Sequence, residues 1–487
     1  MEKSPSDGKT IDAAYIKSVD WSIEAIESLH EEYAYKVKLP GFPIDKAIAT
    51  TIKEPNGEVC CKFFLEKLHD HTFNQNPEKF GIHENIILES SRKNFLIKGN
   101  SISKITLNIG EPQVLTTYSK RIQKGLDEDF DNKILRLVIP IEEKIDLGLF
   151  EYKSVKINQW TKGAGLIDIK VKGKNYHLFT YENDDTKKKY CFIDGVEQNL
   201  FIEFKKNTKA IILGLGFITG NLYQKEYYYQ VIQHDNVTFV ENISFELQEK
   251  SIISNSALFN PFRFKEYVTK LGHEHVLQNI PLRLSTELFS KLCEILCTNE
   301  TIARCTLLIL EGNQSKFILL RASIYSLALE TLTNVIYEEN KDKINPIADK
   351  KLASKIFSKM KDVLNEYSEF LSDSSKNTLE SKINDMNKPT NSKKLSIPFE
   401  LVGIKLKKED LEILNHRNKF LHGTSPFGEK ELSEKEREIV YITKRFHFMI
   451  NCLLLKYVGY RGHIVNYSAW HQLNEKEKIT DHLYQII

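Results

Sequence analysis

The period of the apolar residues changes once along this 487-residue chain, and that change constrains the fold more than any other feature. Up to about residue 245, short stretches rich in β-branched and aromatic residues alternate with Gly, Asn, Asp and Pro. This pattern is typical of strands and tight turns, and it predicts an antiparallel, sandwich-like or rolled sheet. Beyond about residue 250 the apolar residues recur at helical spacing. We therefore expect an α+β multidomain chain with an N-terminal extension (1–32), a β-rich domain (33–250) and an all-α domain (251–487).

Three segments and one apolar stripe give specific predictions about local structure. The segment "NLFIEFKK" (199–206) is predicted to be a strand, whereas "AIILGLGFITG" (210–220) fits either a buried strand or a buried helix. The segment "KPTNSKKLSIP" (388–398) has the Pro, Asn and Ser content of a connecting loop. In the helical half, one stripe of residues is expected to face the core: Phe317, Leu320, Ile324, Leu327, Ala328, Thr331, Leu332 and Val335.

Charge and cysteine content limit the classes of protein to which the chain can belong. The 68 basic and 66 acidic residues leave a formal net charge of +2, so a nucleic-acid surface would be a local patch. The seven cysteines form neither a disulfide framework nor paired C-x-x-C zinc spacing, which favours a reducing compartment. The N-terminal residues do not resemble a signal peptide, and the longest apolar run is too short to span a bilayer. We expect a soluble, cytoplasmic protein that does not contact a membrane.

The stretch "LEILNHRNKFLHG" (411–423) gathers polar groups at the end of an apolar run. A helix is predicted to begin near Glu409 and Asp410, whose carboxylates suit a helix N-terminus. It is predicted to end at His422, with Gly423 as the left-handed residue that closes it. The polar groups therefore lie in the last turn of this helix. A further helix of about 25 residues is predicted after it, from a Ser433 and Glu436 capping box to Gly459.

Arg417, Asn418 and His422 are the polar residues of that last turn. Asn418 and His422 are four positions apart and share a face, with Arg417 beside it, so the three can converge on one point. An Arg can hold a phosphate and neutralise transition-state charge, while a His at the negative end of a helix dipole can transfer protons. Asn418 can bind a phosphate oxygen or orient the histidine. The pattern predicts a phosphodiester site without a metal, although basic residues at a helix end also commonly cap carbonyls.

The residues around this motif resemble a known family. The stretch "RNKFLHG" (417–423) has the R-N-x-x-x-H form of the HEPN ribonucleases, and it lies between two long predicted helices as in that family. The sequence from Ile383 to this motif resembles the ApeA-type branch, as does the helix "LLRASIYSLALETLTNVIYEE" (319–339). The C-terminal resemblance covers about residues 280–460. The β-rich half, including "NFLIKGNSISKITLNIG" (94–110), is similar in pattern to the domain that precedes HEPN in ApeA-like proteins.

The resemblance implies a helical bundle that forms a homodimer, or a higher homo-oligomer, with two motif helices facing each other. It implies metal-independent RNA cleavage, in which the ribose 2′-hydroxyl attacks the adjacent phosphate and leaves a cyclic phosphate and a 5′-hydroxyl. Arg417 would bind the phosphate, His422 would be the general acid or base, and Asn418 would assist them. Glu330 would support Arg417, the alternative being a plain surface glutamate. The family serves as toxins and in antiphage (abortive-infection) defence, which implies a sensing β-rich half, a phage-derived trigger and a tRNA or mRNA substrate.

Other candidate sites have simpler interpretations. The stretches "HDH" (69–71) and "HEH" (273–275) each offer two imidazoles, but no further ligands lie nearby in sequence, so we expect no metal and no cofactor. The basic stretch "KRFHF" (444–448) can touch RNA phosphate, although a solvated helix face is the commoner arrangement. Trp160 and "QKEYYYQ" (224–230) can stack on a base or ligand, although core packing is the commoner role of strand aromatics.

Two other hypotheses about the function of the chain remain open. In one, the chain is a non-catalytic sensor or interaction protein, with a β-rich domain that binds protein or carbohydrate and a structural helical bundle. In the other, a HEPN scaffold keeps its motif but stays inactive until it is triggered. Loss of RNA cleavage on replacing Arg417 and His422 separates the first of these from an active ribonuclease.

Overall fold

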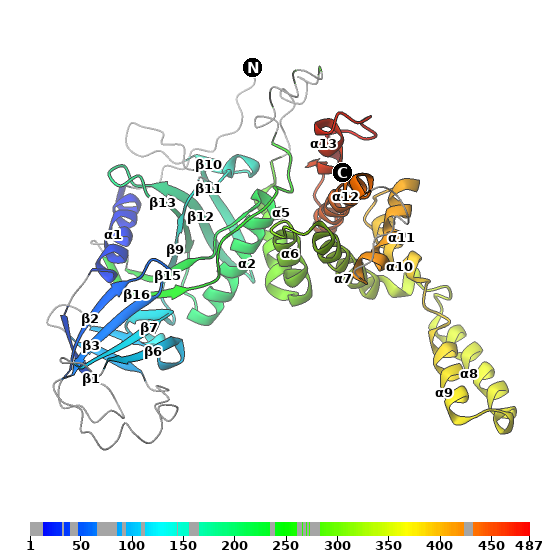
Figure 1. The fold of residues 1–487 in the computed structure, drawn as a ribbon, viewed down its shortest axis with the longest axis horizontal. Coiled ribbons are helices and arrows are strands. Elements are labelled where there is room, and N and C mark those ends of the chain that lie inside the picture. The colour runs from blue at the N-terminus through cyan, green and yellow to red at the C-terminus, as the bar shows by residue number, and fades with distance from the viewer. Residues whose placement is uncertain are drawn as a thin grey trace. The chain divides into compact units, whose positions relative to one another are not determined.

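The computed structural model divides the chain into two compact units. One unit contains residues 1–253 and 283–297, and the other contains residues 254–282 and 298–487. A β-rich part precedes a helical part, which confirms the predicted α+β class (Figure 1). The structure describes these residues: 13–31, 34–38, 47–65, 85–89, 94–108, 113–143, 145–154, 165–233, 239–260, 265, 269, 272, 283–422 and 432–487.

The first unit is built on a 15-stranded sheet whose order is β10-β11-β12-β13-β9-β15-β16-β8-β5-β4-β1-β2-β3-β7-β6. Its neighbouring strands pair antiparallel, as expected for a chain of short strands joined by tight turns. Lys172 and Gly173, both at positive φ, make the turn between β11 and β12. The strands are β1 (Ala34–Lys38), β2 (Ala47–Lys53), β3 (Val59–Leu65), β4 (Ile86–Glu89), β5 (Asn94–Ile97), β6 (Ile102–Asn108), β7 (Gln113–Ser119), β8 (Arg121–Lys124), β9 (Leu135–Ile141), β10 (Lys153–Ser154), β11 (Gly165–Val171), β12 (Lys174–Glu182), β13 (Lys189–Gly195), β15 (Glu226–Gln233) and β16 (Phe239–Leu247).

Helix α1 (Ala13–Leu29) packs its apolar face on this sheet. Val19 and Ile23 enter the same buried cluster as strand residues such as Tyr228. A buried ion pair also fixes the helix to the sheet. Arg136 of β9 binds Asp194 of β13 through Nε at 2.7 Å and donates from Nη1 to the carbonyl oxygen of Ser18 in α1 at 2.9 Å. Burial of the Arg136 charge is compensated by this partner, so the helix has a defined position on the sheet.

The segment 199–206 begins a helix, so the prediction of a strand there is wrong. Helix α2 (Phe201–Thr219) starts after Leu200 and closes at Gly220, which has a φ of 82°. Residues at helical spacing are buried along its whole length: Phe201, Phe204, Thr208, Ile211, Leu215 and Ile218. The alternation of polar and apolar residues over the first few positions concealed this longer helical period, which continues through 210–220.

Helix α5 (Thr286–Thr298) belongs with the sheet, whereas we expected the β-rich domain to end at residue 250. Its Cys293 packs against Gly214 of α2, where an added Cβ would lie 3.3 Å from the sulfur. Its Ser290 hydroxyl accepts a hydrogen bond from the backbone N–H of Lys170 on β11 at 2.9 Å. The predicted boundary at residue 250 therefore assigns α5 to the helical domain, although this helix packs in the first unit.

The second unit is helical, with two 27-residue helices, α7 (Ile318–Ile344) and α12 (Leu432–Val458), packed on each other. Helix α7 also packs against α6, α10 and α11. A short strand pair, β18 (His463–Val465) and β19 (Tyr484–Ile486), lies near the C-terminus. The remaining elements are α6 (Glu300–Gly312), α8 (Lys350–Glu366), η5 (Ser368–Phe370), α9 (Asp373–Asp385), α10 (Asn391–Leu401), α11 (Lys408–Leu421) and α13 (Tyr467–Asn474).

Two local predictions in the second unit are wrong. The predicted loop 388–398 contains most of α10, because the Thr390 hydroxyl caps it and Leu395 and Phe399 bury its apolar side. Helix α12 begins at Leu432, so Ser433 lies inside the helix and is not its N-cap. Its predicted end is confirmed, since the helix stops at Val458 before Gly459, which has a φ of 101°.

Helix α7 is apolar on two faces, and this corrects the predicted stripe. Leu332 and Ala328 of that stripe are buried as expected. Phe317, Leu320 and Leu327 are instead exposed, at 76%, 52% and 46% of their surface. The core side of the helix also contains Ala322, Tyr325, Leu329 and Ile336. No helix in the described parts of the chain has the length and apolar content to cross a membrane.

Candidate functional site

Helix α11 carries the R-N-x-x-x-H motif and is fixed at its start by acidic residues. The backbone N–H of Lys407 donates to the Asp410 carboxylate at 3.0 Å, and Glu409 also lies in the first turn, where negative charge is favourable. Asp410 is buried and accepts a second bond, from Nε of Arg445 on α12, at 2.7 Å. Arg445 also donates from Nη1 to Asp481 at 2.9 Å. The start of α11 is thereby fixed to α12 and to the C-terminal segment.

Arg417 points inward from α11 and contacts α7. Its side chain is only 7% exposed, on the same face as the buried Ile413, Leu414 and Phe420. Its Nη1 lies 2.5 Å from Oε2 of Glu330 on α7, in an ion pair that is not aligned as a hydrogen bond. The Glu330 side chain is 46% exposed. The structure thus places the predicted supporting glutamate on the motif arginine, with the carboxylate at the border between protein and solvent.

The last turn of α11 is also attached to α7. The Ser323 hydroxyl of α7 donates to the carbonyl oxygen of Phe420 at 2.6 Å. Such carbonyls at a helix end have no partner within the helix, so a side chain that satisfies one of them fixes the end in place. Sequence reasoning missed Ser323, because a contact with a backbone atom leaves no residue pattern to find.

Asn418 and His422 are exposed, in contrast to Arg417. They are four residues apart and so share a face of α11, whereas Arg417 is rotated from Asn418 by ~100° about the helix axis. His422 is the residue that ends the helix, and its backbone N–H donates to the Asn418 carbonyl at 3.1 Å. We expected all three side chains to converge on one point. Within a single chain of this structure they do not, because Arg417 points inward while Asn418 and His422 point to solvent. Gly423, the predicted cap, lies outside the described residues.

His416 precedes the motif and is half-buried. Its pKa is lowered by burial and by the charge of Lys419, with the carboxylates of Glu412 and Glu438 acting in the opposite direction. The neutral form of this imidazole is therefore favoured. His416 was not among the predicted site residues, although its position beside Arg417 could have marked it.

The basic stretch 444–448 is not a solvated face, contrary to our expectation. Arg445 and His447 are buried, the former in the pair with Asp410 described above. His447 lies between the rings of Tyr325 and Tyr467, at centroid distances of 5.2 and 5.7 Å. Burial, with the charge of Arg321, lowers the pKa of His447 to about 4, so the ring is neutral near pH 7. These residues stabilise the bundle and are not placed to bind RNA.

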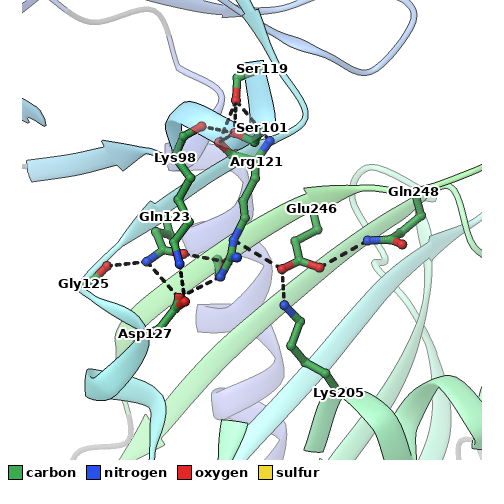
Figure 2. Close-up of polar contacts among 11 residues, drawn as sticks. Lys98, Ser101, Ser119, Arg121, Gln123, Gly125, Asp127, Lys205, Glu246 and Gln248 are labelled. Carbon is green, nitrogen blue, oxygen red and sulfur yellow. Dashed lines mark hydrogen bonds and ion pairs between the residues drawn. The ribbon is translucent and has the colours of Figure 1, made fainter. Parts of the chain in front are cut away.

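Figure 2 shows a network of charged side chains in the first unit. Arg121 on β8 lies 2.8 Å from Asp127, in η3 (Asp127–Phe130), and 3.3 Å from Glu246 on β16. Lys98 is also paired with Asp127, and Lys205 of α2 with Glu246. Each carboxylate thus has two cations, which is the arrangement that compensates partly buried charge. We interpret the network as a structural connection between the sheet and α2.

The remaining predicted sites give no further cluster. Tyr227, Tyr228 and Tyr229 are buried, which is the core role favoured above. The seven cysteines are buried and free. Within the described residues, no group of three or more His, Cys, Asp or Glu side chains is placed to hold a metal ion. The stretches 69–71 and 273–275, and Trp160, lie outside the described residues.

Comparison with known proteins does not assign the chain to a family. No family model matches the chain, and no curated protein or solved structure is significantly similar to it.

Proposed function

We propose that this protein is a metal-independent endoribonuclease of the ApeA-like HEPN kind, which acts as a homodimer in cytoplasmic antiphage defence. The observation that carries the proposal is the ion pair between Arg417 and Glu330, with His422 exposed about one turn further along α11. An arginine held beside an exposed histidine supplies the two functions that transesterification of RNA requires, charge stabilisation and proton transfer.

In the proposed reaction, a base removes the proton of the ribose 2′-hydroxyl, and that oxygen attacks the adjacent phosphorus. The bond from phosphorus to the 5′ oxygen breaks, and an acid protonates this leaving oxygen. His422 suits either proton transfer, because an imidazole nitrogen can accept a proton and an imidazolium N–H can donate one. Arg417 stabilises the charge that develops on the phosphate oxygens, and Asn418 donates to one of them. The products are a 2′,3′-cyclic phosphate and a 5′-hydroxyl.

Glu330 acts on the reaction through Arg417. Burying a guanidinium charge is costly without a compensating partner, and the Glu330 carboxylate is that partner. The carboxylate also fixes the direction of the guanidinium before RNA binds, which reduces the reorganisation needed in the transition state. We therefore assign Glu330 a positioning role.

A second copy of the chain completes the proposed site. One chain supplies one His422, whereas an acid and a base on opposite sides of the phosphate require two. The exposed stripe formed by Leu320 and Leu327 of α7 and by Phe317, the residue before the helix, is an apolar surface that a dimer would bury. It lies on the helix that carries Glu330 and Ser323, the two residues that contact α11. Dimerisation through this face would bring two motif helices together.

The test is RNA cleavage by the full-length protein in EDTA, alone and with extract of phage-infected cells. Arg417→Ala and His422→Ala are each expected to lower the cleavage rate by at least about 100-fold, because each removes a charge or proton-transfer function. Arg304→Ala and His482→Ala are matched controls, since both side chains are exposed and lie outside the motif. Products with cyclic phosphate ends are expected.

Two results would overturn the proposal. Cleavage that persists in the Arg417→Ala, His422→Ala double variant would assign the activity elsewhere, and so would cleavage that requires Mg²⁺. If the wild-type protein cleaves no RNA in either condition, the buried ion pair is best explained as structural. That result would favour the alternative, a non-catalytic sensor or interaction protein.

A further inference from the structure

The helices α8 and α9 form a hairpin that extends from the helical bundle (Figure 1). Its base is closed by Asn387, whose side chain donates to the carbonyl of Ile347 at 3.0 Å and accepts from the backbone N–H of Ile347 at 2.8 Å. Along the two helices only Ala353 and Ile383 are buried. The hairpin therefore has almost no core of its own and exposes most of its surface to solvent.

One face of α8 carries a row of cationic and hydroxyl side chains. Lys351, Lys355 and Lys359 follow at intervals of four residues, with Ser354 and Ser358 beside them, and these side chains line one shallow depression. Successive lysines are ~6 Å apart along the helix axis. In the described structure none of these three lysines has an ion-pair partner. Lys350, which borders the depression, is paired with Asp342 at 2.8 Å, so its charge is already compensated.

An exposed apolar stripe runs beside this lysine row on α8. Leu352, Ile356 and Val363 recur at helical spacing on α8. Tyr367, which ends the helix, and Phe370 of η5 continue the apolar surface to the tip of the hairpin. Tyr367 and Phe370 are 58% and 77% exposed. Large aromatic side chains in water are unfavourable unless a partner covers them, so the tip is a candidate contact point.

We propose that this hairpin binds single-stranded RNA and delivers it to the site at Arg417 and His422. Proteins that hold single strands combine a cationic track for the phosphates with aromatic side chains on which bases stack. The lysine row supplies the track, and Tyr367 and Phe370 supply the stacking surface. The identity of the bound strand as a substrate rests on the proposed ribonuclease function, whereas the binding itself does not.

A linear polyanion fits this surface better than an anionic membrane does. The lysines occupy one flank of the apolar stripe, while the other helix of the hairpin carries Asp373, Glu380 and Asp385 against Lys376 and Lys382. A flat membrane would contact both helices, including these acids, whereas one strand can follow the lysine row alone. The charge distribution therefore favours a nucleic acid strand.

The first experiment measures binding of a single-stranded 2′-O-methyl RNA to the full-length protein over a series of salt concentrations. The methyl group removes the attacking hydroxyl, so binding is measured without cleavage. Replacing Lys351, Lys355 and Lys359 with Gln is expected to make the slope of log K against log salt shallower by about 2, since each phosphate contact contributes about 0.7. A matched variant with Gln at Lys62, Lys104 and Lys124, three exposed lysines of the first unit, should keep the wild-type slope.

The second experiment tests the aromatic tip. Tyr367→Ala with Phe370→Ala is expected to weaken binding of the same RNA by about tenfold or more, with the salt slope unchanged, because stacking is not ionic. Circular dichroism of each variant checks that its helices are retained.

Three outcomes would overturn the proposal. One is an unchanged salt slope in the lysine variant. Another is lysine-dependent binding to anionic phospholipid vesicles without lysine-dependent binding to RNA, which would assign the hairpin to a membrane surface. A third is dissociation of a dimer by the tip variant with RNA affinity retained, which would assign the stripe to a second copy. Failure of the proposed ribonuclease is separate, since it appears as absent cleavage of ordinary RNA while the lysine-dependent slope persists.

Discussion

At the scale of single residues, the pair between Arg417 and Glu330 connects the stability of the helical unit to its proposed chemistry. Arg417 has lost most of its contact with water, whereas Glu330 keeps about half of its own. The cost of burying the arginine is therefore compensated by a carboxylate that remains partly hydrated. Removing the carboxylate should leave the charge of Arg417 buried and its direction undefined.

We predict that Glu330→Gln lowers both the free energy of unfolding and RNA cleavage. The expected loss of stability is about 1–3 kcal/mol, between the ranges for surface and fully buried pairs, and urea denaturation measures it. Cleavage should fall at temperatures where the variant is still folded, because the guanidinium is no longer positioned. Glu338→Gln, on the exposed side of the same helix, is the matched control. Unchanged cleavage by a folded Glu330→Gln variant would contradict the positioning role.

His447 gives a prediction about pH. Burial, with the charge of Arg321, lowers its pKa to about 4 in the folded protein, against about 6.5 in an unfolded chain. Between these values the unfolded state binds a proton that the folded state does not. The free energy of unfolding therefore keeps its full value above pH 6.5. It falls by about 3 kcal/mol as the pH drops toward 4.

Replacing His447 with Gln removes the titrating group, and this should reduce the loss of stability on acidification. Urea denaturation of both proteins at pH 7 and pH 5 measures the difference. The helical unit of the variant is expected to lose less stability between these pH values than that of the wild type. His482→Gln, at an exposed histidine, should behave like the wild type. Equal pH dependence in all three proteins would show that His447 does not contribute to acid sensitivity.

At the scale of elements, the two apolar faces of α7 carry a prediction about assembly. We expect wild-type protein to form a dimer of twice 56.5 kDa, and the substitutions Leu320→Asp and Leu327→Asp together to produce monomers. A carboxylate in an interface core would be buried without a partner, which is strongly unfavourable. Sedimentation equilibrium measures the mass, and Ile202→Asp, on an exposed position of α2, is the control. A monomeric wild-type protein would contradict the role assigned to this stripe.

The same helices show how far the sequence predicts the structure. Periodicity located the motif helix and the end of α12, because start, stop and apolar spacing are local signals. It did not identify the core face of α7, since Leu320 and Leu332 are equally apolar and only packing against other helices distinguishes them. The prediction of a strand at the start of α2 was wrong because polar and apolar residues alternate over its first few positions, which conceals the longer helical period.

The candidate site was predicted in part. The resemblance to HEPN proteins singled out Arg417 and Glu330, which are 87 positions apart, and the structure brings these two side chains together. The inward direction of Arg417 was not predicted, because it depends on which face of α11 packs on α7. The contacts of Ser323 and Arg445 escaped prediction since they join residues that no motif connects.

At the scale of the whole molecule, each of the two units is built from two separate segments of the chain. Residues 254–282 belong to the helical unit, although the next segment, 283–297, returns to the sheet. Within the helical unit, Leu258 pairs with Ile464 and Phe259 packs on Val465. The helical unit, to which we assign the proposed ribonuclease site, therefore cannot be separated from the β-rich unit at one point in the sequence.

This division predicts which fragments of the chain are stable. A fragment of residues 1–253 lacks α5, whose Phe289, Leu292 and Leu296 are buried. It would expose the face of α2 at Gly214, which Phe289 and Leu296 approach. Burial of three such side chains is worth on the order of 5 kcal/mol, a large share of the stability of one unit. A fragment of residues 1–298 retains α5 and should melt at a clearly higher temperature, measured by circular dichroism. Adding a Leu292→Ala, Leu296→Ala pair to the longer fragment should lower its melting temperature toward that of the shorter one. Equal melting temperatures for the two fragments would show that α5 does not stabilise the sheet.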